Sequence, residues 1–503
     1  MSDRSKPTTS TPRPDLDVVP ARYREDVIDL FDTWASVRGR NATLRSYIEM
    51  KQATKDLGIS IPPDLVKVNT VVGWADKAVR VRMVRSKFQG FVFQGEQDRR
   101  LDMLATRNSL EAAYSRGCRG ALTYGCSAMT VMRGAGRRQP PVKVRGFSAN
   151  QCAMLWDKDA DGIGCGLAVV GVDRDGIASR YVLHEPDAVV TLTRDESYEW
   201  ECLVEPHRMG RPLMVPLVHD ADDDRPFGHS VITPEVTGII DKAMRDVLRM
   251  EVGAEFFTAP QRYILGADPD LFSYDQVEEV ARGEADGDAG EDDDSDDPEQ
   301  ARPNDPRKMM RAYLGAWLAL TRDADGNVPQ VGQFAPGDAG NFIAVFENDA
   351  QRFSGATNVP LGQLGVLSNT YTSSDALGAA NDPLILDVER INVSMRESMA
   401  EVARLMMATD RGVAYDELDD RSMGVIAQFA DPAQPTISAT ADAWTKIGAA
   451  DQSLVGTRVW YEGLGLSKAT IDRIMAAMDQ QGSIEFLNEI AQQLQANGGA
   501  SLG

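Results

Sequence analysis

The residue types best suited to chemistry in this chain gather around His219. Acids follow it at Asp220, Asp222, Asp223 and Asp224, and carboxylates beside an imidazole can hold a divalent metal for nuclease chemistry. Neighbouring acids on one exposed loop are more often a solvated run of charge than a site. We therefore assign this cluster no chemistry, and we expect no catalytic residue, no bound metal and no other cofactor.

A second acidic pattern has the spacing of a calcium loop. Asp157, Asp159 and Asp161-Gly162 match the opening of an EF-hand. The match fails at the twelfth position, which is Ala168 instead of a bidentate glutamate, and no helix is expected on either side. The pattern predicts a hairpin turn at Asp161-Gly162, with a second one at Asp175-Gly176.

The signatures of common enzyme classes are missing from the sequence. It contains no G-x-x-x-x-G-K-[ST] and no H-E-x-x-H motif, so it has no recognisable nucleotide or zinc site. His184, Glu185 and His207 fall in expected strands and loops, where a structural or solvent-facing role is the better interpretation. We predict that the chain is not an enzyme.

The charge balance limits the partners of the chain. The chain has 53 Lys and Arg against 76 Asp and Glu, so its formal net charge is −23. This charge argues against tight binding of nucleic acid, because such binding needs a basic surface. A channel through which DNA slides would instead benefit from a neutral or negative wall, because such a wall makes no strong contacts with phosphate. Acidity that only keeps the protein soluble is an equally good explanation.

Composition indicates a globular chain in a reducing setting. Its 503 residues are 43% hydrophobic, enough to bury a sizeable core. The five cysteines are an odd number without a C-x-x-C pair, which favours reduced thiols. No apolar run approaches the roughly 18 residues of a membrane span, so we expect no membrane partner.

Periodicity predicts an alternation of helices and strands. Helices are expected at 22–50, 69–86 and 110–124, a strand at 127–132, and mostly strands at 140–220. A long helix should run from Thr233 to Thr258, because Thr233 can cap it and Pro234 suits its first turn. A strand near 261–266, a helix at 341–356 and a strand at 424–429 complete the pattern.

Two segments between these elements are expected to be loops. Residues 284–299 are almost continuous acid with Gly, Ser and Pro, so they cannot bury apolar surface. Such a stretch can repel DNA or bind a basic partner, although a tolerated insertion is the more frequent explanation. A hairpin is expected around Asp325-Gly326.

The stretch from Asn358 to Leu386, NVPLGQLGVLSNTYTSSDALGAANDPLIL, couples a loop to a long helix. Asn358-Val359-Pro360 closes the preceding helix, Gly and Asn then dominate, and Ser373-Ser374-Asp375 opens a new helical pattern. This layout resembles the tunnel-loop region of tailed-bacteriophage portal proteins, of the siphophage type found in phages infecting actinobacteria. The order of elements over nearly the whole chain agrees with that resemblance.

The resemblance implies an α+β portal fold with a wing, a two-helix stem, a small α/β clip, a long kinked helix and a helical crown. The kink would lie at Asp382-Pro383, since proline bends helices. The expected parts are a disordered arm (1–20), the wing (21–230), a stem helix (231–260), the clip (261–340), a return stem helix (341–357), the tunnel loop (358–375), the kinked helix (376–410), a return to the wing (411–435), and the crown and tail (436–503).

The function implied by the resemblance is a ring at one capsid vertex, expected to be a homododecamer, through which genomic DNA is packaged and ejected. Its partners would be further copies of the chain, double-stranded DNA, the terminase large subunit, major capsid and scaffold proteins, and a head-completion or adaptor protein. The chain would assemble in the host bacterial cytoplasm and end in the virion. The alternatives are another phage structural protein, such as a capsid or tail-ring component, or a cytosolic enzyme with an unrecognised site.

The residues that would meet DNA follow from the same resemblance. In the tunnel loop they are Leu364, Asn369, Thr370, Tyr371 and Thr372. Residues 358–380 contain no Lys or Arg and a single acid, Asp375, so the loop would guide DNA with little grip on phosphate. On the stem helix, Lys242, Arg245 and Arg249 would form a basic stripe facing the channel or a neighbour, or else intersubunit salt bridges.

Overall fold

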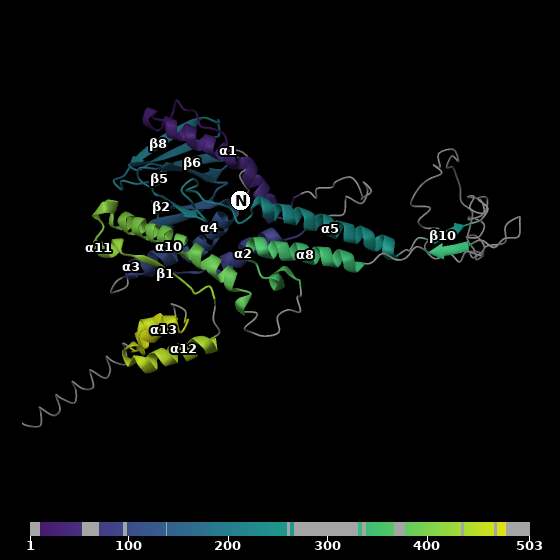
Figure 1. Cartoon of the computed structure of the whole chain (residues 1–503). Helices are drawn as coiled ribbons and strands as arrows, with labels where there is room; N and C mark the ends of the chain where they lie inside the picture. The colour runs from purple at the N-terminus through teal and green to yellow at the C-terminus, as the bar shows by residue number, and fades with distance from the viewer. Residues whose placement is uncertain are drawn as a thin grey trace, which may run out of the picture. The chain divides into compact units, whose positions relative to one another are not determined.

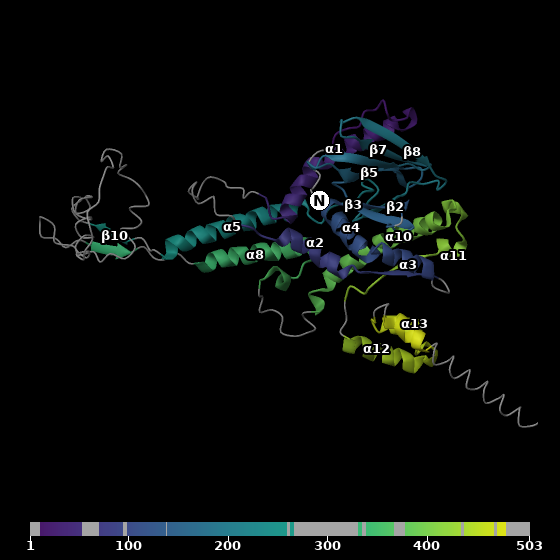
Figure 2. The same ribbon diagram turned by 180° about the vertical axis from the view of Figure 1, so that it is seen from behind.

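The computed structural model describes residues 11–52, 70–93, 98–136, 138–258, 262–265, 330–333, 339–366, 378–433, 437–466 and 470–478. The chain divides into two units. The first is made of Met1–Gln52, Gly73–Thr237 and Phe353–Gly503, and the second of Ala53–Val72 and Gly238–Arg352. Both units combine helices with antiparallel strands (Figure 1, and from behind in Figure 2).

The largest sheet of the first unit is an antiparallel meander. Its strands follow one another in chain order, β4 (Cys152–Asp157), β5 (Gly162–Val172), β6 (Ala178–His184), β7 (Ala188–Arg194) and β8 (Trp200–Pro206). Both predicted Asp-Gly turns are confirmed, since they join β4 to β5 and β5 to β6. The Asp157 carboxylate accepts the backbone N–H groups of Asp159 and Ala160, at 2.9 and 3.3 Å, so it stabilises a turn.

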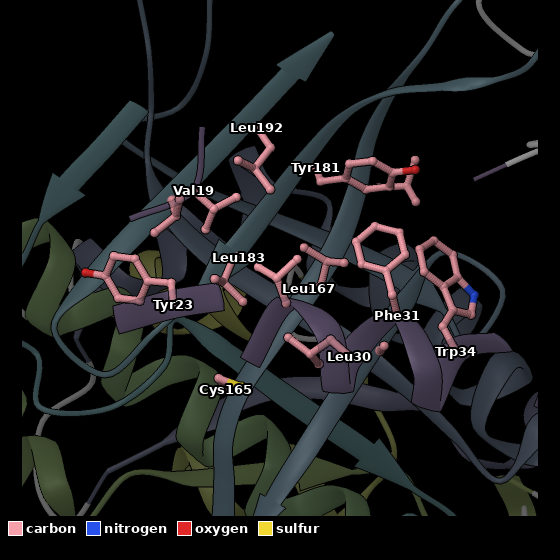
Figure 3. Close-up of a cluster of buried hydrophobic side chains, with 14 of the residues drawn as sticks. Val19, Tyr23, Leu30, Phe31, Trp34, Cys165, Leu167, Tyr181, Leu183 and Leu192 are labelled. Carbon is pink, nitrogen blue, oxygen red and sulfur yellow. The ribbon is translucent and has the colours of Figure 1, made fainter. Parts of the chain in front are cut away.

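Helix α1 (Arg24–Ile48) covers one face of this sheet. Its apolar residues pack on alternate side chains of β5, β6 and β7, and Tyr181 lies edge-on to Phe31 at 5.2 Å between ring centroids (Figure 3). Residues 11–20 are ordered too, which corrects the prediction of a disordered arm over 1–20. Val19 is 1% exposed within this core, and the Pro12 carbonyl accepts a hydrogen bond from the Tyr181 hydroxyl at 2.9 Å. Residues 1–10 lie outside the described part.

A smaller sheet packs against the first. It has the order β3 (Val142–Ser148), β2 (Cys126–Arg133), β9 (Met214–Val218). A second core lies between the two sheets and includes Phe147, Met154 and Met214. Helix α4 (Leu110–Tyr124), whose bounds match the prediction, packs against β2 and β3, and the short helix α3 (Arg99–Arg107) precedes it.

Helix α10 (Asp382–Arg411) is the longest helix of the first unit and packs against β2 and β9. The predicted stripe of Val388, Ile391, Met395 and Met399 is buried. The helix predicted over 376–410 is interrupted directly before Asp382-Pro383, and the bend expected there stays a prediction. Residues 378–379 are helical and 380–381 form a turn, so Pro383 lies in the first turn of α10, where its missing N–H breaks no helical hydrogen bond.

The chain after α10 returns to the start of the first unit. The short elements η5 (Tyr415–Glu417) and α11 (Asp420–Met423) lead into β12 (Ile426–Phe429). β12 pairs antiparallel with β1 (Phe88–Val92), the strand that follows α2 (Trp74–Arg85). The strand predicted at 424–429 is therefore present, and it joins segments more than 300 residues apart.

Two long helices make up most of the described part of the second unit. Helix α5 (Pro234–Thr258) starts as predicted, with the Thr233 hydroxyl accepting the Val236 N–H at 3.3 Å. Helix α8 (Ala339–Thr357) runs beside it (Figures 1 and 2). Between them, β10 (Arg262–Leu265) pairs antiparallel with β11 (Gln330–Gln333). The acidic stretch 284–299 and the hairpin expected at Asp325-Gly326 lie outside the described residues.

The C-terminal region consists of helices in its described parts. They are α12 (Ile437–Ala450), the short turn η6 (Gln452–Leu454), α13 (Arg458–Gly463) and a helix over 470–478. Trp444 and Trp460 pack edge to face, with ring centroids 5.7 Å apart. All five cysteines are free thiols. No helix in the described ranges is long and apolar enough to span a membrane.

Candidate functional site

The predicted DNA-facing loop is described only at its two ends. Leu364 is the last residue of the short helix η4 (Leu361–Leu364) and is half-buried. Asn369, Thr370, Tyr371 and Thr372 lie outside the described residues. The site can therefore be built from the two helix ends that hold the loop, the C-terminus of α8 and the N-terminus of α10.

The end of α8 is fixed by backbone conformation and by burial. Asn358 adopts a left-handed conformation with φ of 52°, which asparagine tolerates better than most residues and which ends the helix. Val359 is fully buried, and the Thr357 hydroxyl donates to the Phe353 carbonyl at 2.6 Å. The chain therefore leaves α8 in a set direction, as Asn358-Val359-Pro360 predicted.

Buried Arg82 of α2 holds both helix ends. Its side chain is 4% exposed, and its guanidinium donates to the carbonyl of Thr357, at the end of α8. The same guanidinium donates to the Asp387 carboxylate in α10 at 2.8 Å and to the Ala78 carbonyl at 2.9 Å. Burial lowers the pKa of Arg82, and the charge of Asp387 opposes that shift.

Two further contacts tie the loop ends to the same place. The Asn358 side-chain amide donates to the Asp387 carboxylate at 3.1 Å, directly linking the start of the loop to α10. Arg85, one turn after Arg82, donates to the Asn381 side chain at 3.4 Å and to the Pro432 carbonyl at 2.8 Å. We call Arg82, Arg85, Asn358 and Asp387 the loop anchor. It attaches residues 358–381 at both ends to one rigid framework.

The predicted basic stripe lies on α5, and its charges are mostly paired within the chain. Lys242 contacts Asp349 of α8 at 2.6 Å and Asp246 at 2.9 Å. Arg249 contacts Asp246 at 3.0 Å. Arg245 makes no hydrogen bond or ion pair with any residue in the described ranges. The sequence suggested a channel-facing or intersubunit role for all three cations, and did not anticipate pairing between the two helices of one chain.

Burial makes the pairing of Lys242 energetically important. Asp349 is fully buried, and the Asp246 side chain is 7% exposed. Burial raises the pKa of Asp349, while hydrogen bonds from Lys242 and Asp349 outweigh burial and lower the pKa of Asp246. The same two carboxylates raise the pKa of Lys242 against the effect of its own burial. Two buried acids at the contact between α5 and α8 thus share Lys242, and Asp246 has Arg249 as a second partner.

The acids around His219 have structural partners. His219 Nδ1 hydrogen-bonds the His229 carbonyl at 2.7 Å, and His229 Nε2 lies 2.8 Å from the Asp222 carboxylate. Asp220 pairs with Arg390 of α10 at 3.0 Å. Within the described part of the chain, no group of three or more His, Cys, Asp or Glu side chains could hold a metal ion.

His184 and Glu185 form a buried titratable pair at the end of β6. His184 is fully buried, neither of its ring nitrogens has a hydrogen-bond partner among the described residues, and burial lowers its pKa to about 3. Glu185 is 6% exposed, and burial, with Asp26 and Asp187 nearby, raises its pKa to about 7. The predicted structural role suits a histidine that stays neutral. The charged form of Glu185, in contrast, is unfavourable because the carboxylate is buried near Asp26 and Asp187.

Replacing Glu185 with glutamine should make the protein more stable at high pH. The pKa of Glu185 rises from 4.5 in the unfolded chain to about 7 in the folded protein. The folded state therefore loses stability as the pH rises from 4.5 through about 7, because the buried carboxylate then has to ionise. At pH 8 the variant should gain up to about 3 kcal/mol in free energy of unfolding, and the gain should vanish near pH 4.

Denaturant unfolding at several pH values measures this effect. Glu201→Gln is the matched control, because Glu201 is exposed on β8, and it should change stability by less than about 0.5 kcal/mol at every pH. A Glu185→Gln effect that does not depend on pH would show that Glu185 is not ionised against burial.

Comparison with known proteins gives the chain a context. No family model matches it. The portal protein of Mycobacterium phage D29 is 24% identical over 470 residues, covering 90% of this chain and 87% of that protein. The portal protein of Mycobacterium phage L5 is 24% identical over 458 residues, covering 89% and 86%. The expected resemblance to phage portal proteins is confirmed.

Solved structures of gene transfer agent particles are also similar to this portal-like chain. A neck structure of the native particle, computed with C12 symmetry, is 13% identical with a TM-score of 0.45, and covers 85% of this chain and 93% of that chain. A neck structure of the empty particle is 12% identical with a TM-score of 0.44 and the same coverage.

The loop anchor was missed by sequence reasoning. Arg82 lies 275 residues from Thr357 and 305 from Asp387, and no local pattern relates them. The only available signal was an arginine on the apolar side of a short helix, between Val79, Val81 and other buried residues. Such a residue needs a buried acceptor, because an unpaired cation is rarely buried.

Proposed function

We propose that this chain is a portal protein, a subunit of a ring at one capsid vertex. Genomic DNA would be packaged and ejected through the ring, and head-to-tail connector proteins would dock to it. One observation carries the proposal: the similarity to two portal proteins extends over about nine-tenths of this chain and of each relative. A shared small domain would not give coverage of that extent.

The order of the described elements supports the proposal. A long helix, α5, is followed by the strand pair β10 and β11 and by the return helix α8. We assign these to the outgoing stem helix, the clip and the return stem helix. The segment held by the loop anchor is then the tunnel loop, α10 is the long helix behind it, and α12 and α13 belong to the crown.

The mechanism that we propose is passive guidance of DNA. Residues 358–380 carry no Lys or Arg, so Asn369, Thr370, Tyr371 and Thr372 would touch the duplex without releasing counterions. The loop anchor keeps the two described ends of the loop in place. On the stem, Lys242 holds α5 to α8, and Arg249 pairs with Asp246 within α5. Arg245 is then the cation of the predicted stripe that is available to the channel or to a neighbouring subunit.

The proposed partners follow from this role. They are further copies of the chain in a dodecamer, double-stranded DNA, the terminase large subunit, major capsid and scaffold proteins, and a head-completion or adaptor protein. The chain is then a structural component of the virion that assembles in the host bacterial cytoplasm. Each subunit would pack head to tail on the next, in a heterologous interface that closes into a ring.

Adding positive charge to the tunnel loop should slow DNA packaging. Thr370→Lys combined with Thr372→Lys would place ammonium groups against phosphates. Each such contact releases counterions and strengthens DNA binding, so the duplex slides less easily. We expect assembled rings in normal yield and a severalfold drop in packaged DNA, measured as nuclease-protected DNA per particle. The defect should shrink as salt rises.

Two further variants complete this test. The matched control, Thr370→Ser with Thr372→Ser, keeps the charge and should package normally. Deleting Leu364 to Thr372 should also leave rings intact but impair packaging or retention of DNA. Normal packaging by both the lysine variant and the deletion would remove the proposed role of the loop.

The mass of the purified chain in solution tests the proposal as a whole. A closed ring should have the mass of about twelve copies of the 54.9 kDa chain. A monomer or compact dimer at high concentration, under several salt conditions, would contradict a ring-forming function.

A further inference from the structure

The charge of the chain is unevenly distributed along the sequence. Residues 112–156 contain seven Arg and Lys and no Asp or Glu, whereas the rest of the chain has 46 basic and 76 acidic residues. A block of 45 residues with a charge of +7 therefore belongs to a chain whose remainder carries −30. Such separation of charge is typical of a surface that recognises an acidic partner.

Much of this positive charge lies on one hairpin. We call Arg133, Arg138, Lys143 and Arg145 the basic hairpin; they belong to β2, β3 and the turn between these strands. Arg133, Arg138 and Arg145 are exposed and Lys143 is half-buried. None of the four forms an ion pair with a residue in the described ranges. Arg119 of the same block, in contrast, pairs with Asp76 at 2.8 Å.

A hairpin of opposite charge lies on the other sheet of the same unit. We call Glu196, Glu199, Glu201 and Glu205 the acidic hairpin; they belong to β8 and the turn before it. All four are exposed, and none of their carboxylates bonds to a described residue. Leu203, on the same face of β8 as Glu201 and Glu205, is 59% exposed. β8 ends the five-stranded sheet in the described structure.

We propose that the basic hairpin of one copy of this chain binds the acidic hairpin of the next copy. Chains of charge −23 repel one another, so a contact between copies is favoured where surfaces of opposite charge meet. Two different surfaces of opposite sign give a heterologous contact that runs head to tail. This inference rests on the proposed ring, and it names two surfaces that join its subunits.

Duplex DNA fits the basic hairpin less well than a second copy does. The positive charge of the basic hairpin is small compared with the negative charge of the whole chain, which repels a polyanion. DNA binding would also leave the acidic hairpin without a partner. The contact between copies would be made by side chains and not by strand pairing along β3. The Asn108 side chain already occupies the backbone groups at the outer edge of that strand. It donates to the Val142 carbonyl and accepts the Val144 N–H, both at 2.8 Å.

Charge reversal on the full-length chain tests the contact. One variant carries Arg138→Glu and Lys143→Glu, and the other carries Glu201→Lys and Glu205→Lys. Each alone cancels the net charge of one hairpin and places like charges together at the reversed positions. Its rings should therefore need a subunit concentration roughly tenfold higher than wild type. Mixing the two variants in equal amounts should restore assembly, because alternating copies present opposite charges at every contact.

A matched control separates this effect from a change in net charge. Lys87 and Lys158 are exposed cations outside the basic hairpin. Lys87→Glu with Lys158→Glu changes the total charge by the same amount as Arg138→Glu with Lys143→Glu. This control should assemble as wild type does. Ring mass at 50, 150 and 500 mM salt is the readout, and wild-type assembly should weaken as salt screens the exposed pairs.

The outcomes distinguish this inference from the function on which it rests. Wild-type chain that forms no ring would overturn the proposed function. Wild-type rings together with unimpaired rings from both reversal variants, or a mixture that fails to recover, would overturn the inference alone. Intact rings that lose affinity for duplex DNA when Arg138 and Lys143 are reversed would also overturn it, and would assign the basic hairpin to DNA.

Discussion

Replacing Lys242 with alanine should lower the free energy of unfolding of the α5 and α8 helix pair by about 3 kcal/mol at pH 8. The substitution leaves Asp349, which is fully buried, and Asp246, which is 7% exposed, without their shared cation. The effect falls at the lower end of the range for a broken buried ion pair, because the Lys242 side chain is itself 36% exposed.

The pH dependence of this loss identifies its cause. Without Lys242, the folded-state pKa of Asp349 should rise further, so the stability of the variant is lost as pH rises through that pKa. The difference from wild type should therefore be smaller at pH 5 than at pH 8. Hydrogen exchange of peptides from 234–258 and 339–357 measures it locally.

Two variants serve as controls for Lys242. Arg245→Ala removes a neighbouring cation that has no partner among the described residues, and should change stability by less than about 0.5 kcal/mol. Adding Asp349→Asn to Lys242→Ala should recover much of the loss, because it removes the buried charge. Equal losses from Lys242→Ala and Arg245→Ala would contradict the assigned network.

Replacing Arg82 with methionine should release the loop anchor and cost about 3 kcal/mol in free energy of unfolding. Methionine fills much of the same space but cannot donate to the Thr357 carbonyl or to Asp387. Both ends of the loop would lose a buried partner at once. We expect faster hydrogen exchange in 353–366 and 378–390, with little change in the distant β5 and β6 hairpin.

Arg80→Met is the matched control for Arg82. Arg80 lies on the same helix and pairs with Asp76 at 3.0 Å, but its side chain is 61% exposed, and Arg119 also pairs with Asp76. Its loss should be below about 1 kcal/mol, as for other exposed pairs. If Arg80→Met and Arg82→Met speed exchange near the loop equally, Arg82 does not hold the loop ends.

Elements with strong local signals were predictable from the sequence. Residues 110–124 formed a helix with the predicted bounds, and Thr233-Pro234 started α5 as capping chemistry requires. The Asp-Gly turns at 161–162 and 175–176 joined the expected strands. In each case the deciding interactions act within a few residues, so the sequence contains the information.

Features that depend on distant residues were not predictable in the same way. Pro383 carries the same local signal whether it bends a helix or begins one, and its place in the first turn of α10, after the turn at 380–381, depends on more than that signal. The pairing of Lys242 with Asp349 spans 107 residues, and the loop anchor spans more. Residues 11–20 looked too polar to fold, yet Val19 and Pro12 find partners on α1 and β6.

Electron microscopy of the purified full-length chain tests the central claim most directly. If the chain is a portal protein, images of the particles should show closed rings with one central hole wide enough for a DNA duplex. A population of compact monomers or dimers without a hole, at every salt concentration tried, would contradict the account.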